Sequence, residues 1–130
     1  MREYNGKVFD KKWVTERITD QTIQWSEGLG KHLTVRDDLK PMTTSQLRRF
    51  FGEVKRIEND FDRNKEDIPM LLPMLAYAVG RKSDTKIKDF ETEMEAAILA
   101  VNNSKDNYAR FVKIFESIVA YHKYYGGKEN

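Results

Sequence analysis

Hydrophobic side chains recur at steps of three and four residues along most of the chain, which is the period of an amphipathic helix. The pattern is clearest over residues 47–61, where six apolar side chains share one side of a helix: Leu47, Phe50, Phe51, Val54, Ile57 and Phe61. Similar spacing predicts helices over 13–29, 87–101 and 107–125, and an apolar run predicts a short helix over 70–79, buried on all sides. No run alternates with period two for long enough to indicate a sheet. We therefore expect an all-α fold, a compact bundle of about five helices.

Glycines and hydroxyl side chains mark the expected helix boundaries. The candidates are Gly28, Gly30 and Gly80 for helix ends and Thr43, Thr44 and Ser45 for a helix start. Residues 31–42 lack a helical pattern and are expected to be irregular. The chain has no internal repeat and no low-complexity tract, so residues 1–130 are expected to form a single helical domain, with 1–10 irregular or flexible.

Composition narrows the class of protein. Hydrophobic residues make up 39% of the chain and charged residues 34%, which is too apolar for a disordered chain and too charged for a membrane protein. Cysteine is absent, so a disulfide framework or thiolate zinc site is impossible and a reducing cytoplasm is the expected location. No segment approaches the roughly 20 apolar residues that span a bilayer, so we expect no membrane partner. The net charge is only +2, so any attraction to nucleic acid depends on where the charges lie.

A basic stripe lies opposite the apolar side of the predicted helix over 47–61. At about 100° per residue, the stripe contains Arg48, Arg49, Gly52, Lys55 and Arg56, and no carboxylate interrupts it. Gly52 weakens a helix by roughly 1 kcal/mol relative to alanine, so its place among the cations suggests that a ligand approaches the backbone closely. A phosphate chain would fit there.

The stripe can also be read as an ordinary solvated face, with its cations paired to acids of the same helix. Arg49 could pair with Glu53, and Arg56 with Asp60, at four-residue spacing. Arg48 has no such partner and Lys55 has only Glu58. Of the stripe, Arg48 and Lys55 are therefore the better candidates for ligand contact.

The last predicted helix carries two apolar stripes. One runs through Tyr108, Phe111, Phe115 and Val119, and the other through Ile114, Ile118, Tyr121 and Tyr125. Two interpretations are open: a central helix packed on both sides, or a second stripe that, with Tyr124, meets another subunit. Tyr121 and Tyr124 could instead stack on nucleobases, although interface packing is favoured.

Motifs for catalysis or cofactor binding are missing from the sequence. Asp60, Asp62 and Asn64 match the first positions of a calcium loop, but Lys65 replaces its glycine and Leu71 its glutamate. There is no phosphate-binding glycine loop and no serine nucleophile elbow. His32 and His122 are isolated and do not make a zinc site. We expect a binding protein that is not an enzyme and has no metal or cofactor.

Three stretches resemble a known family. They are MTTSQLRRFFGEVKRIE at 42–58, PMLAYAVGRK at 73–82 and FVKIFESIVAYHKYYGGK at 111–128. Over roughly 42–128 the chain is similar to the small helical subunit of type III-A (Csm) CRISPR effector complexes. Residues 1–40 lie outside this resemblance, and their role is left open.

The resemblance implies a non-catalytic helical subunit in antiviral defence, which stacks with copies of itself and with other Csm effector subunits. Its basic surface would hold the backbones of the target RNA and of the CRISPR guide RNA. Carried onto this sequence, the implied RNA-binding residues are Arg48, Arg49, Lys55 and Arg56, with Arg81 and Lys82 after the third helix. For Arg81 and Lys82 the alternative is compensation of a helix dipole.

Two other functions remain open at the level of sequence. In a helix-turn-helix DNA-binding regulator, the helix that begins near Thr43 would read bases, but this motif needs a partner helix three or four residues upstream. The segment before Thr43 looks irregular and contains Pro41. A helical protein-protein adaptor is the other alternative, and it predicts no salt-sensitive RNA binding.

Overall fold

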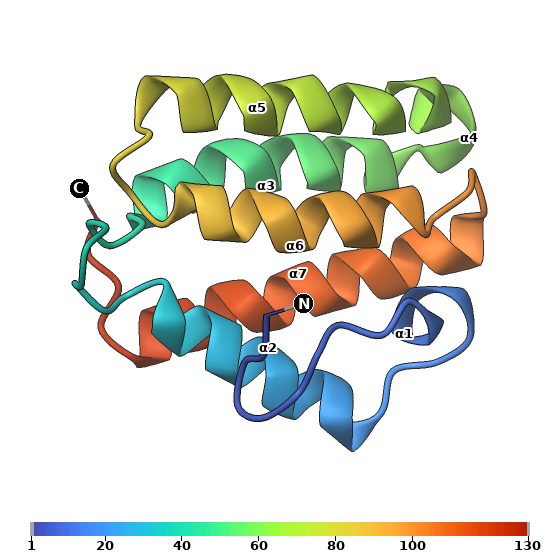
Figure 1. Ribbon diagram of the computed structural model, residues 1–130. Helices are drawn as coiled ribbons and strands as arrows, with labels where there is room; N and C mark the ends of the chain where they lie inside the picture. The colour runs from blue at the N-terminus through green and yellow to red at the C-terminus, as the bar shows by residue number, and fades with distance from the viewer. Residues whose placement is uncertain (1, 130) are drawn as a thin grey trace.

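Helix α7 (Lys105–Tyr124) is the centre of the fold in a computed structural model that describes residues 2–129 (Figure 1). Four more long helices build the bundle: α2 (Asp20–His32), α3 (Thr44–Asn59), α5 (Leu71–Arg81) and α6 (Ile87–Leu99). The remaining elements are short: α1 (Lys12–Thr15), α4 (Phe61–Asn64) and the 3-10 turn η1 (Lys65–Met70). No strand forms within residues 2–129, where two isolated bridges are the only extended pairing. The predicted all-α bundle of about five main helices is confirmed.

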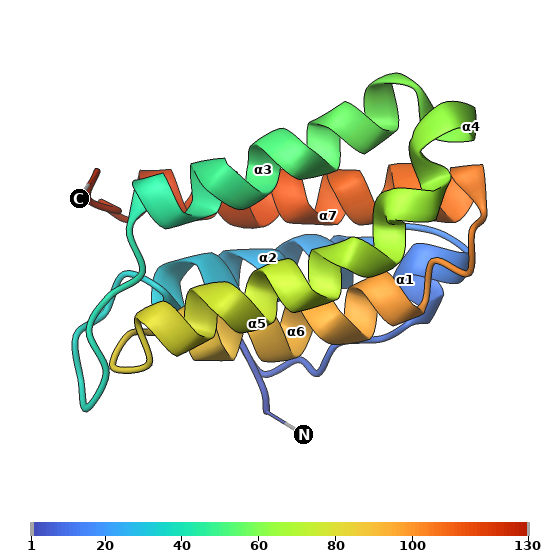
Figure 2. The ribbon, with the colours of Figure 1, turned by 90° about the horizontal axis from the view of Figure 1, so that it is seen from above.

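Helix α7 is packed on two sides, by α2 on one face and α3 on another (Figure 2). Both of its apolar stripes are therefore used inside the chain. Ile114 is 1% exposed and Ile118 is fully buried, so neither side chain can reach another subunit. For these two residues the predicted subunit interface is wrong, because α2 covers the stripe that was left for a partner.

The region predicted as one helix over 13–29 consists of two helices. Helix α1 stops at Thr15, and α2 starts at Asp20 after a capping box in which Thr19 and Thr22 satisfy each other's backbone amides. The break folds α1 back toward α2, so that the rings of Trp13 and Trp25 lie with their centroids 5.6 Å apart. A periodic pattern can span such a break because both pieces bury their apolar side chains in one core.

Gly28 and Gly30 do not end α2, contrary to the prediction. Both lie inside the helix, where other segments come very close. A Cβ atom on Gly30 would lie 2.8 Å from the Cβ of Tyr121 on α7, and one on Gly28 would lie 2.7 Å from the backbone nitrogen of Asn5. These glycines allow close approach of two backbones, which is a second reason for glycine in a helix.

Helix α5 is not buried on all sides as predicted. It lies at the edge of the bundle, against α3 and α6, and buries only Leu71 and Leu75. Tyr77 is 68% exposed on its outer side. Gly80 does not cap it either, because the helix continues to Arg81. An apolar run can thus belong to an outer helix whose far side remains uncovered.

The irregular segment 33–43 is held by hydrogen bonds to the 84–86 turn, which lies between α5 and α6. The Lys86 side chain is 1% exposed, and its Nζ donates hydrogen bonds to the Asp37 carboxylate at 2.8 Å and the His32 carbonyl at 3.1 Å. Backbone bonds between Lys40 and the 84–86 turn complete the link. As a result, the start of α3 lies beside the end of α5.

Residues 2–10 pack against α2 through Tyr4 and Phe9, and Arg2 and His32 both contact the Asp89 carboxylate of α6. Met1 lies outside the described residues.

None of the helices described here has the length and hydropathy required to cross a lipid bilayer.

Candidate nucleic-acid interface

Helix α3 begins after Thr43, which is one of the three cap candidates that the sequence offered. The Thr43 hydroxyl accepts from the Gln46 amide, and the Gln46 side chain accepts from the Thr43 amide at 2.8 Å. Of the predicted apolar side, four residues are buried within α3, namely Leu47, Phe50, Val54 and Ile57, and Phe61 is buried in α4. Since these side chains face inward, the basic stripe faces outward, with Arg48, Arg49 and Arg56 exposed and Lys55 half-buried.

The two cations in the C-terminal half of α3 are already paired with carboxylates. Lys55 Nζ donates to Glu58 at 2.7 Å and lies 3.6 Å from Glu116 of α7. The Glu58 hydrogen bond is the main cause that raises the pKa of Lys55. Lys55 was favoured as a ligand contact because its own helix offers only Glu58 as an acid, but α7 supplies a second one, Glu116.

Arg56 is held in the same way. Its guanidinium bonds to Glu53 and, at 2.7 Å, to Asp67 in the η1 turn, and the Glu53 hydrogen bond is the main cause that raises the pKa of Arg56. The pairing of Arg56 with Asp60 and of Arg49 with Glu53 that the sequence allowed does not form among the described residues. Glu53 pairs with Arg56, three residues toward the C-terminus, which leaves Arg49 without it.

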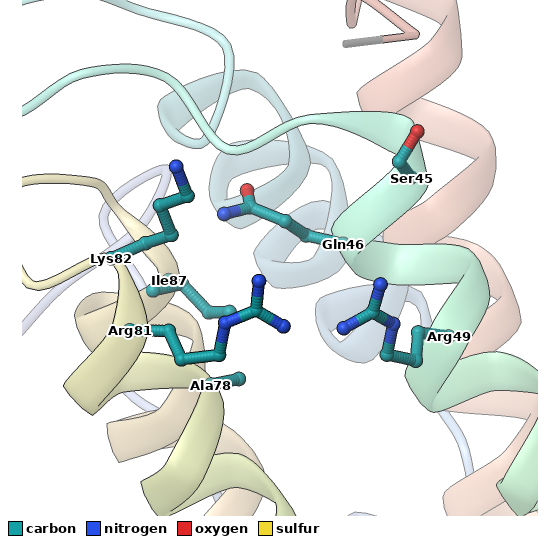
Figure 3. A pocket seen from close by; sticks show the side chains of 7 residues that line it. All are labelled: Ser45, Gln46, Arg49, Ala78, Arg81, Lys82 and Ile87. Carbon is teal, nitrogen blue, oxygen red and sulfur yellow. The ribbon is translucent and has the colours of Figure 1, made fainter.

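The N-terminal half of α3 is different. Arg48 is 69% exposed in its side chain and lies 3.3 Å from one carboxylate, that of Glu129 near the C-terminus. Arg49 points toward the Arg81 guanidinium at the end of α5, and the Lys82 side chain lines the same hollow but points away from Arg49 (Figure 3). Within residues 2–129, no acidic side chain forms an ion pair with Arg49, Arg81 or Lys82. We call these three residues the arginine cluster.

The arginine cluster surrounds a hollow of about 130 Å³ at the surface between α3 and α5. In Figure 3 the guanidinium groups of Arg49 and Arg81 point toward one another across this space, and the Gln46 side chain points in from above. Two like charges that face each other without a carboxylate between them create a local positive potential. Such an arrangement suits an anion with several acceptor oxygens, such as a phosphate.

A larger hollow of about 640 Å³ continues from the cluster past the start of α3. Four basic side chains line it: Arg36, Lys40, Lys82 and Lys128. Lys40 is paired with Asp84 at 2.9 Å, both side chains being well exposed. Three of these four residues were missed by the sequence analysis, because Arg36 and Lys40 lie in the irregular segment and Lys128 follows the last helix. Only the fold brings them to one groove.

Gly52 faces solvent, and a Cβ atom placed on it would meet nothing within 4 Å. No part of the chain among the described residues therefore requires a glycine there. The prediction that a ligand approaches this point of α3 stays a prediction.

The tyrosines at the end of α7 occupy different environments. Tyr124 is 76% exposed. Tyr121 is half-buried, and Tyr125 donates from its hydroxyl to Glu27 at 2.5 Å, which raises the pKa of Tyr125 to about 12. Tyr124 is thus the member of the predicted interface set that is most available to a partner, and its role stays a prediction.

His122 holds the C-terminal end of α7 against the start of α3. Its ring is 1% exposed, and Nε2 lies 2.8 Å from the Met42 carbonyl oxygen. Burial lowers the pKa of His122 below its ordinary value. Among residues 2–129, no three acidic or histidine side chains gather as metal ligands would. The partial calcium motif forms helix α4 instead of a binding loop.

The arrangement of helices also bears on the helix-turn-helix alternative. That motif joins its two helices by a turn of three or four residues. Here α2 ends at His32 and α3 begins at Thr44, and the intervening segment runs across to the 84–86 turn. Helices α2 and α3 are both packed on α7. The fold does not contain the motif at this place.

Comparison with known proteins agrees with the earlier resemblance and extends it. The chain matches the model of the family described as Csm2 Type III-A over residues 16–128, so the match includes α2, which the resemblance had left outside. A protein of Streptococcus thermophilus described as "CRISPR system Cms protein Csm2" is 28% identical over 93 residues, which cover 68% of this chain and 76% of the relative. No solved structure matches the chain. The chain belongs to the Csm2 family and is a small helical subunit of type III-A Csm effector complexes.

Proposed function

We propose that this subunit is non-catalytic and binds the RNA backbone through the arginine cluster and the basic groove beside it. The observation that carries the proposal is that Arg49, Arg81 and Lys82 line one hollow, where Arg49 and Arg81 face each other, without an ion pair among the described residues. Cations that are already paired gain less from a phosphate, because an existing partner must first be displaced. Phosphate contacts carry most of the affinity in proteins that bind nucleic acid without reading its sequence.

Backbone binding suits the place of this family in a type III-A complex. Contacts to phosphates carry no sequence information, so the subunit can accept any target RNA that the guide RNA has paired with. Sequence choice then belongs to the guide. This is a role in cytoplasmic antiviral defence that requires no chemistry from the subunit itself.

The proposal includes stacking of the subunit with copies of itself and with other Csm subunits. A head-to-tail contact that is repeated without closing generates a filament. Tyr124, exposed at the end of α7, is a candidate residue for this contact. Each copy would add one arginine cluster along the RNA, so that many weak contacts sum to a stable complex.

The test is a binding experiment over a series of salt concentrations. Mixed-sequence single-stranded and duplex RNA are titrated with the wild type, with Arg49→Ala combined with Arg81→Ala, and with Lys55→Ala combined with Arg56→Ala. We expect weak, sequence-indifferent binding for the wild type. In the first variant the salt slope should fall by about 0.7 per lost contact on single strands and about 0.9 on duplexes.

The second variant is the matched control, because it also removes two positive charges, in this case both from α3. It should retain most of the affinity, since its cations are bound to carboxylates in the wild type. Equal losses in both variants would contradict the proposed site. Binding of RNA that does not depend on salt would also contradict the proposed site. If neither the lone chain nor the assembled complex binds RNA, the subunit is a helical adaptor that binds only protein.

A further inference from the structure

A second hollow lies directly beneath the arginine cluster, between α3, α5 and α6. It has a volume of about 100 Å³ and an apolar lining that includes Phe50, Leu75, Ile87 and Phe90. Arg49, Arg81 and Ala78 line both this hollow and the polar one above it. The site therefore has a cationic mouth and an apolar floor, which are continuous with each other.

The two parts together restrict the ligand. An apolar floor favours a group that is poorly solvated, while two guanidinium groups at the mouth favour an anion. Drug-sized ligands occupy pockets of about 300–1,000 Å³, so this hollow admits little more than one small ring system. A flat ring that is covalently linked to a phosphate meets both conditions.

Tyr77 adds a stacking surface at the rim of the same hollow. Its ring is 68% exposed, and the Arg81 guanidinium lies 5.9 Å from the ring centroid. Tyrosine rings and arginine planes are the usual supports for unstacked bases in proteins that bind single strands. Neither the Tyr77 nor the Arg81 side chain fills the core, because both residues are exposed on α5.

We infer that this hollow takes one unpaired nucleobase of an RNA strand, stacked at the rim on Tyr77, with the adjoining phosphate between Arg49 and Arg81. The inference rests on the proposed function, since it adds a base subsite to the phosphate site. A base inside a duplex is stacked and paired and cannot enter, so the subsite acts only on single-stranded RNA. An apolar side chain of a neighbouring protein would also fit the floor, but it would leave the two guanidiniums without an anion.

The experiment compares three variants of the full chain on single-stranded and duplex RNA of mixed sequence. Ala78→Leu fills the shared wall of the two hollows, and Tyr77→Ala removes the stacking surface without disturbing the core. Ala76→Leu is the matched control, because Ala76 is exposed on the same helix and lines neither hollow. We expect Ala78→Leu and Tyr77→Ala each to weaken single-stranded binding about tenfold. Duplex binding should be unchanged in Tyr77→Ala, because Tyr77 does not line the phosphate hollow, and Ala76→Leu should behave as the wild type.

A fluorescent base reports occupancy directly. Single-stranded RNA that carries 2-aminopurine should change its emission on binding the wild type and the Ala76→Leu variant, and should show a smaller change with Tyr77→Ala. Thermal melting of each variant establishes that it is folded, and Tyr77→Ala tests the inference even where Ala78→Leu is unstable.

The outcomes separate the two proposals. If Tyr77→Ala retains wild-type affinity for single strands while Arg49→Ala with Arg81→Ala loses it, the base subsite is overturned and the phosphate site stands. If the double arginine variant binds both RNAs as the wild type does, the proposed function itself fails. Equal losses on single strands and duplexes for Tyr77→Ala also overturn the base subsite.

Discussion

The two halves of α3 carry similar cations on one outward face, but their surroundings differ. In the C-terminal half, Lys55 and Arg56 are each bound by two carboxylates, from α3 itself and from α7 or the η1 turn. In the N-terminal half, Arg48 pairs with Glu129, but Arg49 faces Arg81 of α5 and forms an ion pair with no acid among the described residues. The comparison teaches that a basic stripe on one helix is not one surface, because neighbouring elements decide which of its charges are available.

The largest expected effect comes from placing an acid in the N-terminal half. Arg81→Glu puts a carboxylate opposite Arg49, so the two pair and the cluster becomes neutralised like the C-terminal half. We expect the affinity for RNA at low salt to fall on the order of 100-fold, with a reduced salt slope. Titration across salt concentrations measures both.

The control for this change is Arg17→Glu, which alters the net charge equally on an exposed side chain that follows α1. It should weaken binding only slightly. An equal loss in both variants would mean that net charge, and not the cluster, governs the affinity.

A smaller effect is expected from releasing a cation in the C-terminal half. Glu58→Gln combined with Glu116→Gln removes both acids that hold Lys55, so this lysine becomes available to a phosphate. We expect the affinity for RNA to rise roughly fivefold and the salt slope to increase by about one contact. Glu91→Gln with Glu95→Gln on α6 changes the net charge by the same amount. If the two double variants bind RNA equally, Lys55 lies away from the RNA path.

Gly52 lies between the two halves and gives a third test. Gly52→Ala should raise the free energy of unfolding by about 0.5–1 kcal/mol, because the new methyl group meets nothing and alanine favours the helix. If an RNA backbone approaches α3 here, the methyl group keeps it away, and we expect an affinity loss of about threefold, less than one full phosphate contact. Chemical denaturation and RNA titration measure the two effects. A more stable variant with unchanged affinity would contradict the close approach.

The smallest expected effect is a dependence of stability on pH, which arises beside the N-terminal half of α3. Burial lowers the pKa of His122, whose ring holds the Met42 carbonyl just before α3. The unfolded chain therefore binds this proton more readily, since its histidines titrate near about 6.5. The stability from neutral His122 is present above that pH and is lost as the pH falls through the lower folded value. Urea unfolding between pH 8 and 5.5 should show this decline.

The matched variant is His122→Gln, which keeps a side-chain amide that can donate to Met42 but removes the titrating group. It should be less stable than the wild type at pH 8 and show a flatter dependence on pH. Burial lowers the pKa of His32 too, so part of the decline should remain. A variant with the full wild-type slope would exclude His122 as the cause.

Where the sequence analysis was accurate, it relied on local rules. The Thr43 cap and the buried face of α3 follow from residues within one or two helical turns of each other. The resemblance to the small Csm subunit was carried by α3, α5 and α7, and the family match confirms it. The local pattern of apolar residues was also sufficient to predict the number of long helices.

The errors came from residues whose environment is set by distant parts of the chain. Gly28 and Gly30 looked like helix ends, but they lie inside α2, where the 2–10 segment and α7 come too close for a side chain. Ile114 and Ile118 looked like a spare surface until α2 covered them. For Lys55 the sequence indicated only one acid, Glu58, because Glu116 lies on another helix. In each case the deciding contact joins residues far apart in sequence.

By itself, the sequence determined the class of fold, the helices that build it, the side of α3 that is buried and the family to which the chain belongs. These properties depend on periodicity, capping and matching residues along the chain. Only the tertiary structure decided which cations are paired, where Arg49 meets Arg81, and that an apolar hollow lies beneath them. The physical reason is that charge pairing and cavities depend on distances across the fold, which the pattern along one helix does not contain.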